Sequence, residues 1–158
     1  MMIEPFFGKK LHIIYIDGQE EKMADCIFCM IVQGKIPCAR LMEDDHVISF
    51  LDINPINPGH ALVVPKKHYP TLFEIPAEEL EACILASQKI GKAVFKAVGA
   101  SGLNLVQNNF RSAGQLIDHV HFHLIPRDER DGFLTAWPGR PYAGGEIEKM
   151  LEKVKAHM

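Results

Sequence analysis

Three histidines at alternate positions constrain this chain more than any other feature of its sequence. The segment His119-Val-His-Phe-His-Leu-Ile125 alternates polar and apolar residues without a break. Successive side chains of a β-strand point to opposite faces, so a strand here would place the imidazoles on one face and Val120, Phe122 and Leu124 in the core. An ordinary amphipathic strand explains polar residues at these positions but not three histidines. We therefore interpret the segment as a strand that carries a chemical site.

Two kinds of chemistry fit three imidazoles on one strand face. Neighbouring histidines can converge on one metal ion, as in three-histidine zinc sites. Alternatively, a neutral imidazole can act as a nucleophile or exchange protons, because its ordinary pKa of about 6.5 leaves both protonation states accessible near neutral pH. The spacing alone does not choose between them.

The rest of the sequence predicts an α+β fold with an antiparallel sheet of about five strands. Residues 76–98 repeat apolar side chains at helical spacing and predict one long helix, while shorter helices are expected at 25–34 and 147–154. Strands on both sides of one long helix are typical of α+β folds. The expected strands are 39–43, 46–51, 60–65, 103–108 and 119–126.

Length and composition bound the class of protein. The 158 residues, of which 47% are hydrophobic and 23% charged, fit one globular domain. Periodic patterning begins near Asp25, so residues 1–22 are expected to be an extension outside the fold and residues 23–158 the single domain.

Charge and hydropathy exclude several partners and locations. The net charge of −3 and the lack of long basic runs argue against nucleic acid or a membrane surface as a partner. No apolar run approaches the roughly 20 residues of a membrane span, and the first 22 residues lack the pattern of a signal peptide. We therefore expect a cytoplasmic protein with reduced cysteines.

A close pair of cysteines offers a second candidate site. Cys26 and Cys29, on the expected first helix, supply half of a tetrahedral zinc site. A redox pair and an inert core pair are the alternatives, although a redox pair usually follows a strand rather than preceding the first one. The residues alone leave these three interpretations open.

Together these segments resemble one known family. The histidine segment matches the His-φ-His-φ-His-φ-φ signature of the histidine triad (HIT) family, in which φ is apolar. The resemblance extends over nearly the whole chain after Met23, and the chain is most similar to the Hint branch of small nucleotide-binding hydrolases. It implies a HIT-like fold and a homodimer. The other matching segments are Cys26–Cys29, Gly34–Pro37, Phe50–Ile53, Pro58–His60, Pro65–His68, Asn108, Ala113–Gln115 and Pro126–Arg127.

The resemblance implies a hydrolase of nucleoside phosphoramidates or related purine nucleotide conjugates. In that family the middle histidine, here His121, attacks the α-phosphorus and forms a nucleotidyl-histidine that water hydrolyses. His123 is the implied phosphate contact near the leaving group, and His60 supports it. Two alternatives remain: a diadenosine polyphosphate hydrolase or nucleotidyl transferase, and, from another class, a zinc-stabilised nucleotide-binding or scaffold protein.

Matching positions also imply how the nucleotide is held. Asp52 corresponds to the acidic residue that binds the ribose hydroxyls. One departure concerns Leu116, where the family commonly has serine or threonine. The implied phosphate cradle contains Asn108, Gly114 and Gln115, and the implied apolar wall around the base consists of Ile27, Phe28, Ile31, Phe50 and Ile53.

Zinc-containing members of the family imply a structural zinc ion in this chain. Their ligands match Cys26, Cys29, His68 and His119. This assignment would make the first histidine of the segment structural and leave His121 and His123 free for chemistry.

Overall fold

The computed structural model describes residues 26–132 and 138–158. The predicted extension at 1–22 lies outside these residues. The elements in chain order are helix α2 (Ile27–Val32), strands β1 (Arg40–Glu43), β2 (Val47–Leu51) and β3 (Ala61–Pro65), helix α3 (Ala77–Val98), strand β4 (Gly102–Val106), 3₁₀ turn η1 (Arg111–Ala113), strand β5 (Phe122–Arg127) and helix α4 (Glu146–Lys155).

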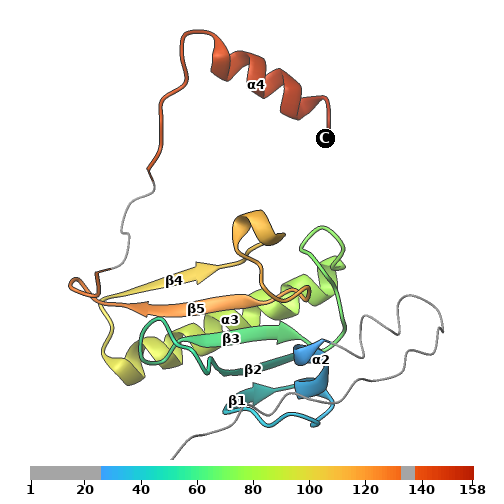
Figure 1. Ribbon diagram of the computed structural model, residues 1–158, viewed down its shortest axis with the longest axis vertical. Coiled ribbons are helices and arrows are strands. Elements are labelled where there is room, and N and C mark those ends of the chain that lie inside the picture. The colour runs from blue at the N-terminus through green and yellow to red at the C-terminus, as the bar shows by residue number, and fades with distance from the viewer. Residues whose placement is uncertain (1–25, 133–137) are drawn as a thin grey trace, which may run out of the picture.

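The five strands form one sheet in the order β1-β2-β3-β5-β4 (Figure 1). Every neighbouring pair is antiparallel. The sheet and its long helix confirm the predicted α+β fold. Each predicted strand is present, with ends that differ by up to three residues from the sequence-based bounds.

Each face of the sheet is covered by a different helix. In β3, Ala61 and Val63 face the α3 side and pack in one apolar cluster with Cys83 and Ile90. The intervening Leu62 belongs to a second cluster on the opposite face, with Phe28, Cys29 and Phe50. The histidines lie on this second face, because His123 stands directly opposite Leu62 in the β3–β5 pairing.

The long helix begins and ends where the sequence indicates. The helix begins at Ala77, one residue later than predicted, so Pro76 caps the helix and is not its first residue. Gly99 ends the helix with φ +64°. Gly91 lets α3 approach β4 closely, since a Cβ there would lie 2.9 Å from Cδ2 of Leu103. This helix packs against the face of the sheet away from the histidines.

The predicted strand at 119–126 is partly wrong, because β5 begins only at Phe122. Pairing with β3 stops at Val63–Phe122. Beyond it Pro65 has no N–H to donate, and its carbonyl accepts the His119 Nε2–H at 2.9 Å. The alternation of side chains nevertheless continues through Val120, which is fully buried in the α3 cluster.

The predicted terminal helix is confirmed as α4, but none of its residues is buried. Figure 1 shows it apart from the sheet. The assignment of 23–158 to a single domain therefore stays a prediction. No helix within the described residues has the length and apolar character needed to cross a membrane. The exposed apolar residues of α4 are Ile147, Met150, Leu151 and Val154.

Candidate active site

His121 is held as a neutral imidazole with one unprotonated nitrogen. Its Nδ1–H donates to the backbone carbonyl of His119 at 2.7 Å, which leaves the lone pair on Nε2. The ring is 5% exposed and lies edge-on to Phe28, with centroids 5.1 Å apart. Burial lowers the pKa of His121, so the ring stays neutral and nucleophilic at neutral pH.

His60 and His123 form a chain of hydrogen bonds whose protons can be assigned. The backbone N–H of Ile56 donates to His60 Nδ1 at 3.1 Å, so the proton of His60 is on Nε2. That Nε2–H donates to His123 Nδ1 at 2.9 Å. The remaining proton of a neutral His123 is therefore on Nε2, where it can be donated to another group.

The pKa values agree with neutral rings in this pair. Burial, together with the neighbouring His121 and His60, lowers the pKa of His123 to about 4. Burial also lowers the pKa of His60, against the attraction of Asp52. A carboxylate oxygen of Asp52 lies 3.8 Å from His60 Nε2.

Asp52, His60 and His123 are close enough to hold a metal ion, since their ligand atoms lie within 4.8 Å of one another. The hydrogen bonds argue against that use. The Ile56 N–H occupies Nδ1 of His60 and fixes the proton on the nitrogen that would have to bind the metal. This cluster is better suited to passing a proton.

The second cluster has the dimensions of a zinc site. Cys26 Sγ and Cys29 Sγ lie 3.4 and 3.6 Å from His119 Nδ1, and Cys29 Sγ lies 3.4 Å from His68 Nδ1. The two Nδ1 atoms are 3.2 Å apart. A tetrahedral zinc ion with ordinary Zn–S and Zn–N bonds needs about 3.6 Å between sulfur and nitrogen and about 3.3 Å between nitrogens.

The chemistry of these four donors also fits zinc. His119 donates Nε2–H to the Pro65 carbonyl, so the lone pair of Nδ1 points at the cysteines. Burial lowers the pKa of His119 to about 4, which keeps the ring neutral. Burial, together with Cys26, raises the pKa of Cys29 to about 12 in the absence of a cation, and a bound metal ion would offset this shift.

The implied phosphate loop brings Asn108 and Gly114 together. Gly114 has φ +90°, a conformation that favours glycine, and a Cβ there would lie 3.6 Å from the Asn108 amide nitrogen. The loop from 107 to 115 lies three residues before the histidine segment in the sequence.

Gln115 is placed differently from the expectation that it binds nucleotide. It is 1% exposed, and its Oε1 accepts the Phe110 N–H at 2.7 Å. Its Nε2 donates to the carbonyls of Pro70 at 2.6 Å and Ile117 at 3.0 Å. Both polar atoms of the side-chain amide are therefore hydrogen-bonded to backbone groups. The side chain of Gln115 holds the loop in its conformation and does not face the space where a phosphate would bind.

The implied apolar wall is only partly assembled. The rings of Phe28 and Phe50 lie 5.9 Å apart in a buried cluster, and Ile27 and Ile31 pack against it. Ile53 is 86% exposed and is absent from this cluster. It follows the end of β2 at Leu51, where the chain leaves the sheet, so its side chain extends into solvent.

Comparison with known proteins identifies the family. The HIT domain profile matches residues 33–130. This chain belongs to the HIT domain family.

Two relatives and one solved structure show how far the likeness extends. An uncharacterized HIT-like protein of Methanocaldococcus jannaschii is 54% identical over 130 residues, which cover 82% of this chain and 98% of that protein. An adenosine 5'-monophosphoramidase of Schizosaccharomyces pombe is 44% identical over 132 residues, covering 83% and 96% of the two chains. The crystal structure of a zinc-bound histidine triad protein from Mycobacterium smegmatis superposes with a TM-score of 0.67 at 31% identity, covering 86% and 99%.

Sequence reasoning missed two features beside the site of this HIT protein. The Ile56 N–H determines which nitrogen of His60 carries the proton. A hydrogen bond from a backbone N–H leaves no pattern in the side chains, so the sequence could not predict it. Phe73 and Phe110 form an exposed stacked pair next to the phosphate loop. A bulky residue within a loop of small and polar residues was the available signal for Phe110.

Leu116→Ser is expected to tighten nucleotide binding by about ten-fold. Leu116 is 69% exposed directly after the phosphate loop, so its replacement removes no core packing. A serine hydroxyl there would add one charge-assisted hydrogen bond to phosphate, which contributes about 1.5 kcal/mol. Titration calorimetry with AMP would measure the dissociation constant, and an unchanged or weaker value would mean that backbone groups already satisfy the phosphate.

Proposed function

We propose that this HIT protein is a hydrolase of nucleotide conjugates, such as nucleoside phosphoramidates, and that His121 is its nucleophile. The proposal rests mainly on the pattern of protons at the site. His121 presents a lone pair at Nε2, whereas the neighbouring His123 presents a proton at Nε2. The rings lie 4.9 Å apart, so a nucleophile and an acid stand side by side.

The reaction would proceed in two displacements. In the first, His121 Nε2 forms a bond to the α-phosphorus, the bond to the leaving group breaks, and His123 Nε2–H gives its proton to the leaving atom. In the second, water attacks the α-phosphorus, His123 accepts a proton from the water, and the phosphorus–nitrogen bond to His121 breaks. The products are the nucleoside monophosphate and the free leaving group, with both histidines restored.

We assign the remaining contacts to binding. Asp52 would hold the ribose hydroxyls, since its carboxylate lies beside His60 at the same site. Asn108 and the backbone around Gly114 would surround the phosphate. The half-exposed Ile27 and Ile31, with the buried Phe28 and Phe50 behind them, would form the wall of a purine pocket.

We propose a structural zinc ion held by Cys26, Cys29, His68 and His119. It would tie the start of α2 to the histidine segment. Its effect on catalysis would be indirect, because the carbonyl of His119 is the group that orients His121. Reduced thiols at such a site suit the cytoplasm, and all four cysteines are free.

The proposed function is tested with adenosine 5'-phosphoramidate, diadenosine tetraphosphate and an adenylylated lysine as substrates. We expect release of AMP from the phosphoramidate, with a nucleotidyl-protein adduct that forms and decays at the rate of turnover. Binding without turnover of any of the three would favour the nucleotide-binding scaffold instead. Preference for diadenosine tetraphosphate, or transfer of AMP to added phosphate, would favour the two enzymatic alternatives.

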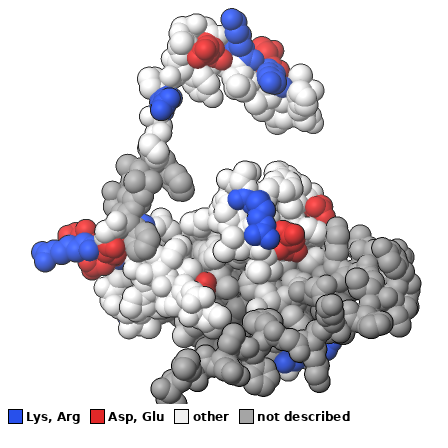
Figure 2. Space-filling model, in the orientation of Figure 1, with Lys and Arg blue, Asp and Glu red and all other residues white. Residues whose placement is uncertain are grey.

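A small-molecule substrate also suits the surface charge. On the face in Figure 2, basic and acidic side chains lie in small mixed groups rather than in one basic surface. Proteins that bind nucleic acid through its backbone usually gather lysine and arginine on one face.

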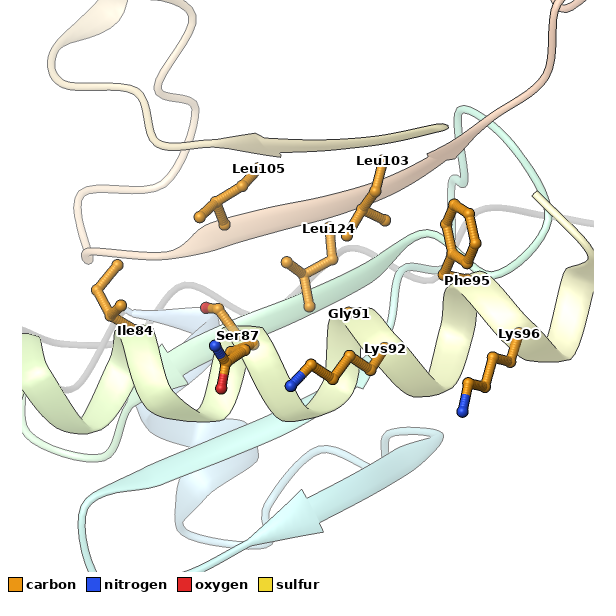
Figure 3. A pocket seen from close by; sticks show the side chains of 10 residues that line it. Ile84, Ser87, Gly91, Lys92, Phe95, Lys96, Leu103, Leu105 and Leu124 are labelled. Carbon is orange, nitrogen blue, oxygen red and sulfur yellow. The ribbon is translucent and has the colours of Figure 1, made fainter. Parts of the chain in front are cut away.

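We propose that the protein forms a homodimer through the free edge of β4. An apolar groove of about 410 Å³ lies between this strand and α3. In Figure 3, Leu103 and Leu105 point from the strand toward the helix that carries Ile84 and Phe95. These four side chains are 37–51% exposed, and β4 pairs with β5 on one side only within the described sheet. A second copy could cover the groove and pair the two β4 edges around a two-fold axis.

Leu105→Glu is expected to convert the dimer to monomers at micromolar concentration. A buried, unpaired carboxylate at the centre of the interface would oppose association. Size-exclusion chromatography with light scattering measures the mass. The matched control is Leu41→Glu, which places the same charge on the opposite edge strand at a side chain that is 43% exposed, and it should remain dimeric. A monomeric wild type would contradict the proposal.

A further inference from the structure

Two phenylalanine rings form an exposed aromatic pair at the phosphate loop. Phe73 and Phe110 stack with centroids 5.9 Å apart and an interplanar angle of 25°. Phe73 is 76% exposed and Phe110 55% exposed, so neither ring is part of the core. Large exposed aromatic rings contribute little to folding and often mark a binding surface.

The backbone of Phe110 adds a second, independent observation. It has φ 66° and ψ 160°, a combination that is essentially confined to glycine. Among the described residues it is the one non-glycine residue with positive φ. The conformation is enforced by Gln115, whose Oε1 accepts the Phe110 N–H at 2.7 Å and whose own N–H donates to the Phe110 carbonyl at 3.1 Å.

The strain is not offset by burial of the ring. A glycine would adopt this backbone freely, whereas the phenylalanine is 55% exposed and stacks on another exposed ring, that of Phe73. A strained backbone that presents a large ring to solvent is what a binding contact requires.

Hydrogen bonds fasten both rings to the candidate active site. The Leu72 N–H donates to Asn109 Oδ1 at 2.8 Å, which joins the residues immediately preceding the two phenylalanines. The Val120 N–H donates to the Tyr69 carbonyl at 2.7 Å, one residue from His121. Phe73 follows Tyr69 by four positions, a span of at most about 14 Å. Phe110 also lies in the loop that carries Asn108 and Gly114, so the pair stands at the proposed phosphate cradle.

We infer that Phe73 and Phe110 form a stacking subsite for a planar ring on the leaving group of the substrate. This inference rests on the proposed function, because a leaving group is present only if the protein cleaves nucleotide conjugates. Two substrates supply the same chemistry: a phosphoramidate whose amine carries an aromatic ring on a flexible spacer, and a dinucleoside polyphosphate, whose second base is such a ring.

The test compares adenosine phosphoramidates that differ only in the leaving amine. One amine carries an indole ring on an alkyl spacer, and the other carries the spacer alone. We expect the wild type to prefer the ring by about ten-fold in kcat/KM, in keeping with the strength of aromatic stacking on a ligand ring. Diadenosine tetraphosphate is the third substrate. If the protein prefers it but does not prefer the indole phosphoramidate over the spacer alone, the planar ring that the subsite binds is the second base of a dinucleoside polyphosphate.

Two variants assign the preference to the pair. Phe73→Ala and Phe110→Gly should each lower the kcat/KM ratio of the two phosphoramidates toward one, and glycine is chosen because it fits the backbone at 110. The control Leu41→Ala removes an exposed apolar side chain from the far edge strand and should leave the ratio unchanged.

The outcomes separate the two proposals. If the wild type cleaves both phosphoramidates and diadenosine tetraphosphate without any preference for a ring, or if a preference survives both substitutions, the subsite is wrong and the proposed function stands. If the wild type cleaves none of these substrates, the proposed function fails and the subsite fails with it. A variant that lowers kcat/KM for both phosphoramidates equally would show that the ring only shapes the loop.

Discussion

His121→Ala is expected to reduce turnover of adenosine phosphoramidate by about 10⁴–10⁶-fold while the chain remains folded. The substitution removes the only group proposed to bond to phosphorus, and loss of a nucleophile has effects of this size. The ring contributes one hydrogen bond, to the His119 carbonyl, so the fold should survive its removal. Turnover is measured under saturating substrate and folding by thermal melting. Turnover near the wild-type level in a folded variant would refute the mechanism.

His123→Ala serves as the comparison for this prediction. It removes an acid rather than the nucleophile, so turnover should fall by about 10²–10⁴-fold with an amine leaving group. With fluoride as the leaving group, which leaves without a proton, the loss should be much smaller. Equal losses for both leaving groups would mean that the ring does not protonate the leaving atom.

The pH dependence follows from the same rings. Burial lowers the pKa of His121 below its ordinary value, so the nucleophile remains unprotonated as the pH falls through 6.5. The acid limb of the kcat/KM profile should therefore lie below pH 6.5.

The second large effect is expected from Cys29→Ala, which should release zinc and destabilise the protein. We expect about one zinc ion per chain in the wild type and none in the variant. Folding coupled to a structural zinc ion contributes many kcal/mol, so the free energy of unfolding should fall by at least about 3 kcal/mol and the Tm by about 10 °C. Elemental analysis and thermal melting measure the two quantities.

Controls at two other positions make this prediction specific. Cys38→Ala alters a half-buried cysteine that packs against the same apolar cluster but lies outside the metal ligands, and it should retain zinc. His119→Ala should lose zinc, whereas His121→Ala should retain it. The reverse result would exchange the structural and catalytic histidines. A wild-type protein purified without chelators that contains no zinc would contradict the metal site.

Much of the fold was predictable because the strands are short apolar runs and the long helix has a clear apolar repeat. The alternation in the histidine segment correctly predicted that Val120, Phe122 and Leu124 lie in the core. The sequence did not show where β5 begins, because that depends on which group binds the Pro65 carbonyl. The side chain of His119 donates to this carbonyl, where a neighbouring strand would have donated a backbone N–H.

The site was less predictable where the role depends on a side chain's surroundings. The family resemblance implied that Ile53 belongs to the apolar wall, but the turn after β2 leaves its side chain in solvent. The resemblance implied that Gln115 contacts the nucleotide, but its side-chain amide is hydrogen-bonded to three backbone groups. Neither outcome is visible in local patterns, because both are decided by where distant loops pass.

The hydrogen bonds that orient the histidine rings come from the main chain. The carbonyls of Pro65 and His119 and the N–H of Ile56 fix three of the rings. A peptide group is present whatever side chain occupies a position, so sequence drift around the site can alter its shape and charge without moving a proton. The donor at 56 is the exception, since a proline there would remove it. Which nitrogen of each of these rings carries a proton is therefore determined by the path of the backbone, and most point mutations should leave it unchanged.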